Sequence, residues 1–364
     1  MHVTRLEIAH FRRFQRVSLA PGAGLNLLTG DNGAGKTSVL EALHLMAYGR
    51  SFRGRVRDGL ISTGADAVEV FVEWEETVSA RTRRAGMRHG GQAWEGRLDG
   101  ASVTHLGELC AALAVVTFEP GSHVLVTGGG EPRRRLLDWG LFHVEPMFLP
   151  LWRRYARALR QRNALLKSRA RDAELDAWDR ELAEAGEPIT RHRQDYLEQL
   201  QPLLHAVAAD LLPVAGVTTL DFHPGWRRDE LSLSDALLLA RDRDRAAGFT
   251  STGPHRADWR VGYAAFPGRE ALSRGQAKLT ALAILLAQAE LHAAVRGEWP
   301  VVALDDLASE LDRAHQARVM TRLQASGAQV FITGTEAPAG LPNPGMPVAR
   351  FHVEHGQIRA EAGV

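Results

Sequence analysis

The chain has 364 residues, 45% of them hydrophobic and 24% charged, which is the composition of an ordinary globular protein with about two domains. Its single cysteine, Cys110, excludes a disulfide framework and a zinc site built from cysteines. Its net charge of +1 excludes a polycation that coats nucleic acid indiscriminately.

Neither a membrane span nor a signal peptide is expected. The longest apolar stretch, residues 279–295, is interrupted by Gln288, Glu290 and His292, so we expect a buried helix there. The N-terminal residues alternate in polarity like a strand and lack the apolar core of a signal peptide. We therefore expect a cytoplasmic protein.

The beginning of the chain predicts two strands, a glycine loop and a helix. Residues 3–8 alternate in polarity, and residues 25–29 form a short apolar run that ends at Gly30. From Lys36 onward, apolar residues recur with the spacing of one buried helical face. Further elements are predicted at residues 68–74 (strand), 81–100 (hairpins) and 115–118 (strand).

A run of glycines at 128–130 marks a change in the character of the chain. Residues 133–212 have a helical period and are rich in Leu, Ala and Arg. No heptad pattern persists over four repeats, so we expect no long coiled coil. The prolines expected to cut this stretch into separate helices are Pro150, Pro188, Pro202 and Pro213. The expected core anchors are Trp139, Trp152 and Trp178.

After Gly248 the sequence returns to strands. They are predicted at residues 258–264, 300–304, 329–333 and 348–354. These strands complete an α/β unit that the first half of the chain starts, so the sequence predicts one nucleotide-type α/β domain interrupted by a helical insertion. We place the α/β domain at residues 1–127 and 249–364, and the insertion at 128–248.

The segment after the second predicted strand matches a phosphate-binding loop. It has the pattern G-x-x-x-x-G-K-[ST] between a predicted strand and a predicted helix, as that motif requires. Its glycines let backbone N–H groups point at phosphate oxygens, whereas the alternative is a glycine-rich turn without a ligand. We expect Lys36 to contact the β- and γ-phosphates and the Thr37 hydroxyl to bind Mg²⁺. The predicted nucleotide-binding residues are Gly30, Asp31, Asn32, Gly33, Ala34, Gly35, Lys36, Thr37 and Ser38.

Two carboxylates follow the apolar strand predicted at 300–304. A buried parallel strand delivers such residues at the carboxyl edge of its sheet. With the phosphate loop upstream, we predict that Asp305 holds Mg²⁺ and that Asp306 orients or deprotonates the attacking water. Lys36, Asp305 and Asp306 are thus the candidate catalytic residues. The alternative is an acidic helix cap, a position that Asp favours.

A third motif precedes the long apolar helix. Ser273, Gly275 and Gln276 offer hydroxyl and N–H donors at a helix entry, although a capping turn would use the same residues. The segment 309–312, Ser-Glu-Leu-Asp, follows the two carboxylates. This order of motifs resembles that of ABC-type ATPases. In those proteins the Ser-x-Gly-Gln turn closes over the γ-phosphate held by another subunit, so two ATP molecules join two heads.

Over essentially the whole chain, the sequence resembles the RecF family, the ABC-type recombination mediators of bacteria. A transporter ATPase would carry a longer Leu-Ser-Gly-Gly-Gln turn and would lack the segment Gly-Pro-His-Arg at 253–256. The residues that carry the resemblance are Phe11, Arg12 and Arg13, the segments 30–38, 49–53, 133–139 and 161–163, and the segments 253–258, 272–278 and 304–312.

The resemblance implies a fold, a cofactor and partners. The fold is α/β: a P-loop ABC-type ATPase head with a mixed sheet and an inserted, mainly helical second lobe. The cofactors are ATP and Mg²⁺, with Arg12 in the nucleotide site and with Ser273, Gly275 and Gln276 on the ATP of the partner subunit. The implied activity is an ATP-dependent homodimer that binds double-stranded DNA and junctions of single- and double-stranded DNA. With RecR and RecO it would load RecA at single-strand gaps and support the SOS response.

Three positions depart from the general ABC pattern. Residues 118–122 contain no Gln of the kind that senses Mg²⁺ in many ABC proteins. Thr333, Gly334 and Thr335 stand where transporters carry a switch histidine. Asp306 is one methylene shorter than the usual Glu, and for that reason we expect slow ATP turnover.

Arginine clusters are candidates for DNA binding, because such residues neutralise phosphates without reading sequence. No base-reading motif is present, which favours recognition of DNA structure or backbone. The alternative is a solvated helix face in a chain with only three lysines among its 44 Lys and Arg residues. The first cluster is Arg50, Arg53, Arg55 and Arg57; the second is Arg153, Arg154, Arg157, Arg160, Arg162, Lys167, Arg169 and Arg171.

Three rival functions remain open. A transporter-coupled ATPase would need membrane subunits. A small-molecule P-loop kinase would act as a monomer with its own lid arginines, so ATP-dependent dimerisation distinguishes it. A structural ABC head would bind ATP without hydrolysing it, and removal of Asp306 would then change nothing measurable.

Overall fold

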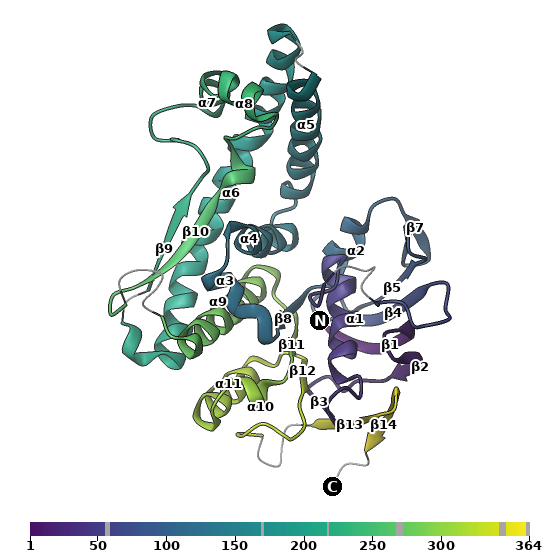
Figure 1. The fold of residues 1–364 in the computed structure, drawn as a ribbon. Coiled ribbons are helices and arrows are strands. Elements are labelled where there is room, and N and C mark those ends of the chain that lie inside the picture. The colour runs from purple at the N-terminus through teal and green to yellow at the C-terminus, as the bar shows by residue number, and fades with distance from the viewer. Residues whose placement is uncertain (55–58, 169–170, 217, 267–271, 342–346, 362–364) are drawn as a thin grey trace. The chain divides into compact units, whose positions relative to one another are not determined.

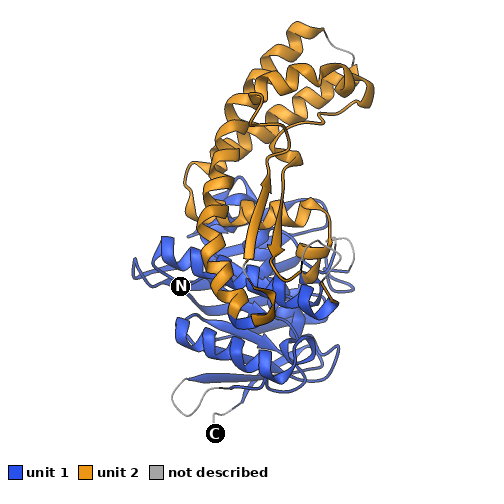
Figure 2. Ribbon diagram, turned by 90° about the vertical axis from the view of Figure 1, so that its left-hand side faces the viewer, with its two compact units in different colours: residues 1–122, 210–212, 274–364 blue, residues 123–209, 213–273 orange. Residues whose placement is uncertain are grey.

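The computed structural model describes residues 1–54, 59–168, 171–216, 218–266, 272–341 and 347–361. Arg55, Arg57 and Arg169 therefore lie outside the described residues. The chain forms two compact units. Unit 1 contains residues 1–122, 210–212 and 274–364, and unit 2 contains residues 123–209 and 213–273 (Figure 2).

A mixed sheet of six strands in the order β14-β13-β3-β12-β11-β8 forms the centre of unit 1 (Figure 1). All neighbouring strands are parallel except β13 and β14. The four strands β3, β12, β11 and β8 are short and nearly continuously apolar, as expected for parallel strands covered on both faces. The strands are β3 (Leu25–Thr29), β8 (Val115–Phe118), β11 (Val301–Leu304), β12 (Val330–Thr333), β13 (Val348–Glu354) and β14 (Gln357–Glu361).

A second sheet in unit 1 is antiparallel, in the order β2-β1-β4-β5-β6-β7. Alternate residues of β1 and β4, such as Leu6, Ile8 and Val72, are buried in a core that they share with the helix after the phosphate loop. The strands are β1 (His2–Phe11), β2 (Phe14–Leu19), β4 (Val68–Glu76), β5 (Arg81–His89), β6 (Trp94–Leu98) and β7 (Ala101–Val103).

Five α-helices complete the described part of unit 1. The longest of them passes the length and hydropathy test for a membrane span, but 72% of its apolar window is buried in the fold and it packs on β8, as a core helix does. This agrees with the buried helix predicted at 279–295. The helices are α1 (Lys36–Tyr48), α2 (Leu106–Ala112), α9 (Arg274–Arg296), α10 (Leu307–Glu310) and α11 (Arg313–Ser326), with the 3-10 turn η1 (Pro120–His123) at the end of the unit's first segment.

Unit 2 is mainly helical. Its central element, α6 (Asp172–Leu211), is one helix of 40 residues. The remaining elements are α3 (Val124–Thr127), α4 (Gly130–Val144), α5 (Phe148–Ser168), α7 (Leu233–Leu239), α8 (Arg241–Ala247), β9 (Thr218–His223), β10 (Asp258–Tyr263) and the 3-10 turns η2 (Pro213–Ala215) and η3 (Pro254–Arg256).

The prediction that the prolines divide this region was wrong for two of them, Pro188 and Pro202, whereas α4 ends at Val144 and α5 begins at Phe148, close to Pro150. Pro188 and Pro202 lie inside α6, and Pro150 lies in the first turn of α5, where no intrahelical N–H bond is lost. An internal proline costs a helix about 3 kcal/mol. Buried side chains on both sides of each proline, such as Ile189 and Leu204, supply packing that outweighs this cost.

The strand predicted at 258–264 does not join the α/β sheet. It is β10, and it pairs along its whole length with β9 in a separate two-stranded antiparallel sheet. Residues 249–273 consequently belong to unit 2, and not to the α/β part where we placed them. Of the three expected core tryptophans, Trp139 is buried and Trp178 is half-buried, but Trp152 is 38% exposed and is not a core anchor.

Candidate nucleotide-binding site

The phosphate loop connects β3 to α1 and needs glycine at specific positions. Gly30, Gly33 and Gly35 have φ angles of 143°, 78° and 119°, a region that side chains disfavour. At Gly30 a Cβ would lie 2.1 Å from the carbonyl oxygen of Val353, so no other residue fits there without moving β13. The loop is therefore shaped by contacts from the far end of the chain.

Lys36 begins α1, and its ammonium group closes the loop from inside. Nζ donates to the carbonyl oxygens of Gly30 at 2.6 Å and of Asp31 at 2.9 Å. Burial lowers the pKa of Lys36, while the carboxylates of Asp306 and Asp305 oppose that shift. The ammonium thus lies between the loop and the acidic edge of the sheet, as its predicted role at the phosphates requires.

Asp305 follows β11 and is 3% exposed. Its Oδ1 accepts hydrogen bonds from the Thr37 hydroxyl at 2.8 Å and from the Thr333 hydroxyl at 2.6 Å. Burial raises the pKa of Asp305, and the two hydroxyl bonds counteract the rise. The structure thus brings Thr37 and Asp305, the two predicted Mg²⁺ residues, into direct contact.

Asp306 has a φ of 54°, in the left-handed region, which turns the chain sharply at the end of β11. Its backbone N–H donates to the Thr333 hydroxyl at 2.9 Å. Thr333 therefore holds both carboxylate residues, a role that sequence reasoning missed because it treated Thr333 only as a departure from the transporter pattern. Its place at the carboxyl end of β12, between β3 and β11, was the available signal.

Arg12 and Arg13 follow β1 and reach the same place. The Arg12 guanidinium donates to the Glu41 carboxylate of α1 through Nε at 3.1 Å and Nη2 at 2.7 Å, and Glu41 is fully buried. The Ser51 hydroxyl donates to the same carboxylate. Arg13 Nη1 donates to the carbonyl oxygen of Gly33 at 2.8 Å. Glu41 thus fixes the position of Arg12 beside the loop.

A cavity of about 490 Å³ joins these residues, a volume typical of ligand sites. It includes most of the predicted site but not Gly30, Asp31 or Ala34. Glu119, from the segment noted for its missing Gln, also lines it and accepts from the Gly121 N–H at 2.5 Å. A larger hollow of about 730 Å³ lies on the antiparallel sheet and contains none of the motif residues. The cavity is lined by Arg12, Arg13, Asn32, Gly33, Gly35, Lys36, Thr37, Ser38, Phe52, Arg53, Glu119, Pro120, Asp305, Asp306 and Thr333.

The residues present fit Mg²⁺ beside a phosphate chain. The Thr37 hydroxyl and the Asp305 carboxylate are the hard oxygen donors that Mg²⁺ prefers. Within the described ranges no group of three or more His, Cys, Asp or Glu side chains could hold a metal by itself. The remaining ligands would come from phosphate and water, as in other nucleotide sites.

The predicted partner-facing turn lies at the beginning of α9. The Ser273 side chain and Gly275 are exposed, and Gln276 is half-buried. Neither Gly275 nor Gln276 lines the cavity of its own chain. Exposure leaves this turn accessible to another molecule.

Comparisons with known proteins show the family of this chain. Residues 2–339 match the family model described as the RecF/RecN/SMC N terminal domain. The chain is 68% identical over 367 residues to the DNA replication and repair protein RecF of Xanthomonas axonopodis pv. citri (strain 306), with 100% of both chains covered. The chain belongs to the RecF family. A RecF of Thioalkalivibrio sulfidiphilus (strain HL-EbGR7) is 40% identical over 99% of each chain.

The fold is that of RecF in solved structures. A structure described as the recombination mediator protein RecF-ATP in the RecFOR pathway has a TM-score of 0.88 and 24% identity, and the match covers 99% of this chain and 98% of that one. An Smc head bound to the C-winged helix domain of ScpA gives a TM-score of 0.59 at 16% identity. The predicted fold class, an α/β ABC-type head with an inserted helical lobe and no long coiled coil, is confirmed for this RecF-family chain.

Proposed function

We propose that this RecF-family chain is an ATP-dependent DNA-binding clamp of recombination repair and replication, with a slow, DNA-stimulated ATPase activity. One observation carries the proposal: Lys36, Thr37, Asp305 and Asp306 line one cavity at the carboxyl edge of the mixed sheet. The family's name and the ATP-bound RecF structure support the same function.

Each cavity residue has a separate role in the proposed ATP hydrolysis. Lys36 and the N–H groups of the loop bind phosphate oxygens, and Thr37 with Asp305 would hold Mg²⁺, which stabilises developing negative charge on the phosphates when bound. Asp306 orients or deprotonates water at the end of β11. The Thr333 hydroxyl fixes the positions of Asp305 and Asp306 by hydrogen bonds to both residues.

The proposed dimer uses the exposed turn at the beginning of α9. Ser273, Gly275 and Gln276 would bind the γ-phosphate of a nucleotide held by a second copy of the chain. A kinase would act as a monomer, and a transporter ATPase would couple to membrane subunits. The RecF-family match over residues 2–339 favours the clamp over both alternatives.

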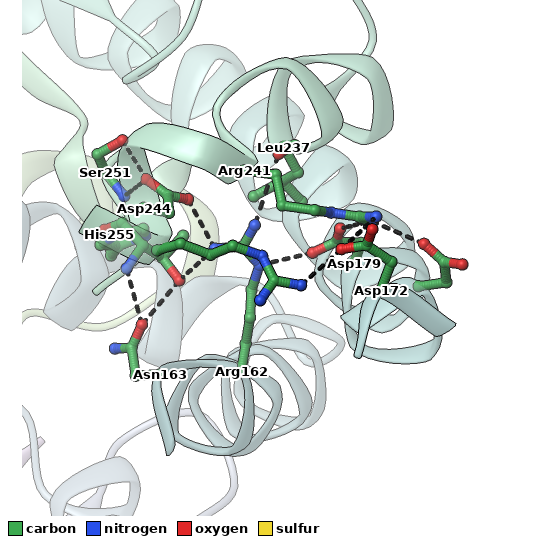
Figure 3. Close-up of polar contacts among 12 residues, drawn as sticks. Arg162, Asn163, Asp172, Asp179, Leu237, Arg241, Asp244, Ser251 and His255 are labelled. Carbon is green, nitrogen blue, oxygen red and sulfur yellow. Dashed lines mark hydrogen bonds and ion pairs between the residues drawn. The ribbon is translucent and has the colours of Figure 1, made fainter. Parts of the chain in front are cut away.

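The arginines predicted to bind DNA differ in burial and in their ion-pair partners. Arg162 is fully buried between Asp179 and Asp244 (Figure 3), and Arg154 pairs with Glu181 and Glu184. In the first cluster Arg50 is half-buried and Arg53 lies 3.9 Å from Glu41, while Arg171 lies 3.7 Å from Glu174. The residues left exposed on one face of α5 are Arg153, Arg157, Arg160 and Lys167.

These four exposed cations, the α5 stripe, repeat with the spacing of a single helical face. A ridge of this kind suits the phosphates of a duplex, since it needs no base contacts. We therefore place double-stranded DNA on the α5 stripe. In the cell we propose action in the cytoplasm at junctions next to single-strand gaps, with RecR and RecO, to load RecA and support the SOS response.

The first test is the mass of the protein in solution, with and without ATP-Mg²⁺ and a short duplex. We expect ATP to convert the wild type into a dimer that binds DNA. Ser273→Arg is expected to remain monomeric while still binding ATP, because the larger charged side chain blocks the interface and leaves the chain's own cavity intact. A wild type that is monomeric in every condition would refute the clamp and favour a kinase or a purely ATP-binding head.

A second test concerns the α5 stripe. Changing Arg153, Arg157 and Arg160 together to Gln is expected to weaken duplex binding on the order of tenfold at ~0.15 M salt, and to reduce the slope of log K against log salt by about 3. Fluorescence anisotropy over a salt series measures both. Arg154→Gln on the same helix is the control, since its paired guanidinium contributes little net charge; equal losses for control and stripe variants would remove the stripe from the DNA site.

A further inference from the structure

An ion pair joins α9, whose first turn carries Gly275 and Gln276, to α10, which begins directly after Asp306. Lys278 of α9 places Nζ 2.5 Å from Oε2 of Glu310 at the end of α10. The side chains are 29% and 12% exposed, so the pair is largely screened from water. Lys278 is one of only three lysines in this arginine-rich chain, and Lys36 in the phosphate loop is another.

Glu310 is linked to Asp306 by a single helical turn. The backbone N–H groups of Ser309 and Glu310 donate to the carbonyl oxygen of Asp306 at 3.0 and 3.2 Å. The side-chain amide of Gln316 in α11 donates to the carbonyl oxygen of Leu311 at 2.7 Å. Backbone hydrogen bonds therefore connect Glu310 directly to Asp306, the residue predicted to orient water.

Lys278 is linked in the same way to the exposed turn. It lies three residues after Gly275, within the first two turns of α9, and its neighbours Ala277 and Leu279 are buried. A shift of Lys278 along the helix axis therefore shifts the beginning of α9, which carries Gly275 and Gln276. The ion pair thus joins the segment next to the chain's own ATP and the segment that would face the partner's ATP.

We propose that the Lys278–Glu310 pair is a positioning contact that couples the two nucleotide sites of the dimer. It rests on the proposed function, since it acts only where ATP joins two copies. Glu310 follows the position of Asp306, and Lys278 transmits it to the turn at Gly275. The turn then reaches the partner's γ-phosphate only when the segment around Asp306 is in its ATP-bound position.

A second ion pair on α9 provides a matched control. Glu290 binds Arg322 of α11 through Nε at 2.6 Å and Nη2 at 3.2 Å, with exposures similar to those of the first pair. It joins α9 to α11, whereas the Lys278–Glu310 pair joins α9 to α10, and it lies far along α9 from Gly275. A contact that only stabilises the fold would behave like this control.

The experiment is a double-mutant cycle on ATP-dependent dimerisation. The variants are Lys278→Gln, Glu310→Gln and both together, with Glu290→Gln and Arg322→Gln as controls. Mass in solution as a function of protein concentration gives the dimer dissociation constant. A nucleotide titration at a protein concentration below this dissociation constant gives the ATP affinity of the monomer. If Glu310→Gln does not fold, Glu310→Asp replaces it, because one methylene less also breaks the contact.

We expect each single variant to weaken the dimer about tenfold, and the double variant to weaken it no further, because the two side chains act as a unit. ATP affinity of the monomer stays within about twofold of wild type, and both controls dimerise like wild type. Additive losses, dimerisation at wild-type strength or an equal loss in the controls would each overturn the coupling alone. A wild type that ATP does not dimerise would overturn the proposed function as well.

Discussion

Replacing Arg162 by methionine is expected to cost unit 2 about 3–5 kcal/mol of unfolding free energy, because the change leaves the fully buried carboxylate of Asp244 without its ion-pair partner and leaves Asp179 with Arg241 alone. Arg162 is fully buried, and its Nε donates to Asp179 at 2.5 Å and its Nη1 to Asp244 at 2.7 Å and to Thr250 at 2.9 Å (Figure 3). One side chain thus ties α5 to α6, α8 and the segment before η3. Methionine keeps an unbranched apolar stem, but it is shorter than arginine and offers no donor.

Chemical unfolding followed by circular dichroism measures this loss. The control is Arg154→Met on the same helix, whose ion pairs with Glu181 and Glu184 lie at the surface, so a loss of less than about 1 kcal/mol is expected. Arg162→Met should also leave ATP binding unchanged, since the cavity is made by residues of unit 1. Equal stabilities for the two variants would show that the buried network contributes no more than a surface pair.

Lys36→Met is expected to abolish detectable ATP binding and to lower ATP hydrolysis at least about 100-fold, the scale seen when a charged donor at a transition state is removed. The variant loses the ammonium that bonds Gly30 and Asp31 and that offsets part of the negative charge of Asp305 and Asp306. ATP-dependent dimerisation should disappear with it, because the nucleotide would join the two copies.

The measurements are equilibrium binding of a fluorescent ATP analogue and phosphate release without DNA. Lys167→Met is the matched control, an exposed lysine of the α5 stripe that should leave both quantities at wild-type values. A Lys36→Met protein that keeps wild-type hydrolysis would place the reaction in some other cavity.

Local sequence signals predicted the elements that carry the candidate site. The phosphate loop, α1 and the strands β3 and β11 occur where the sequence indicated, because glycine spacing and short apolar runs depend on neighbouring residues alone. Thr333 could not be assigned in this way, since its role arises only when β12 is parallel to β11 and their ends align. The role of Glu41 could not be predicted for a similar reason, because its partner Arg12 is distant in the sequence and only the fold brings the two side chains together.

The predictions that failed are those in which contacts between distant residues outweigh local sequence preferences. Pro188 and Pro202 break an isolated helix, but α6 has a buried face that keeps it continuous. β9 was not assigned from the sequence, and it pairs along its whole length with β10. The arginines of α5 look alike in the sequence, and only the positions of Asp179 and Asp244 separate the structural Arg162 from the exposed stripe.

The strands that pair with β3 determine when the phosphate loop can fold during synthesis of the chain. The strand that leads into the phosphate loop pairs with β12 on one side and β13 on the other, and Gly30 packs against Val353. All strands of the antiparallel sheet, in contrast, lie between His2 and Val103 and can pair early. A ribosome releases the partners of β3 last, so the nascent chain carries its phosphate loop through nearly all of translation before that loop can be shaped. The phosphate loop therefore takes its described shape only after β13 has left the ribosome and paired with β3.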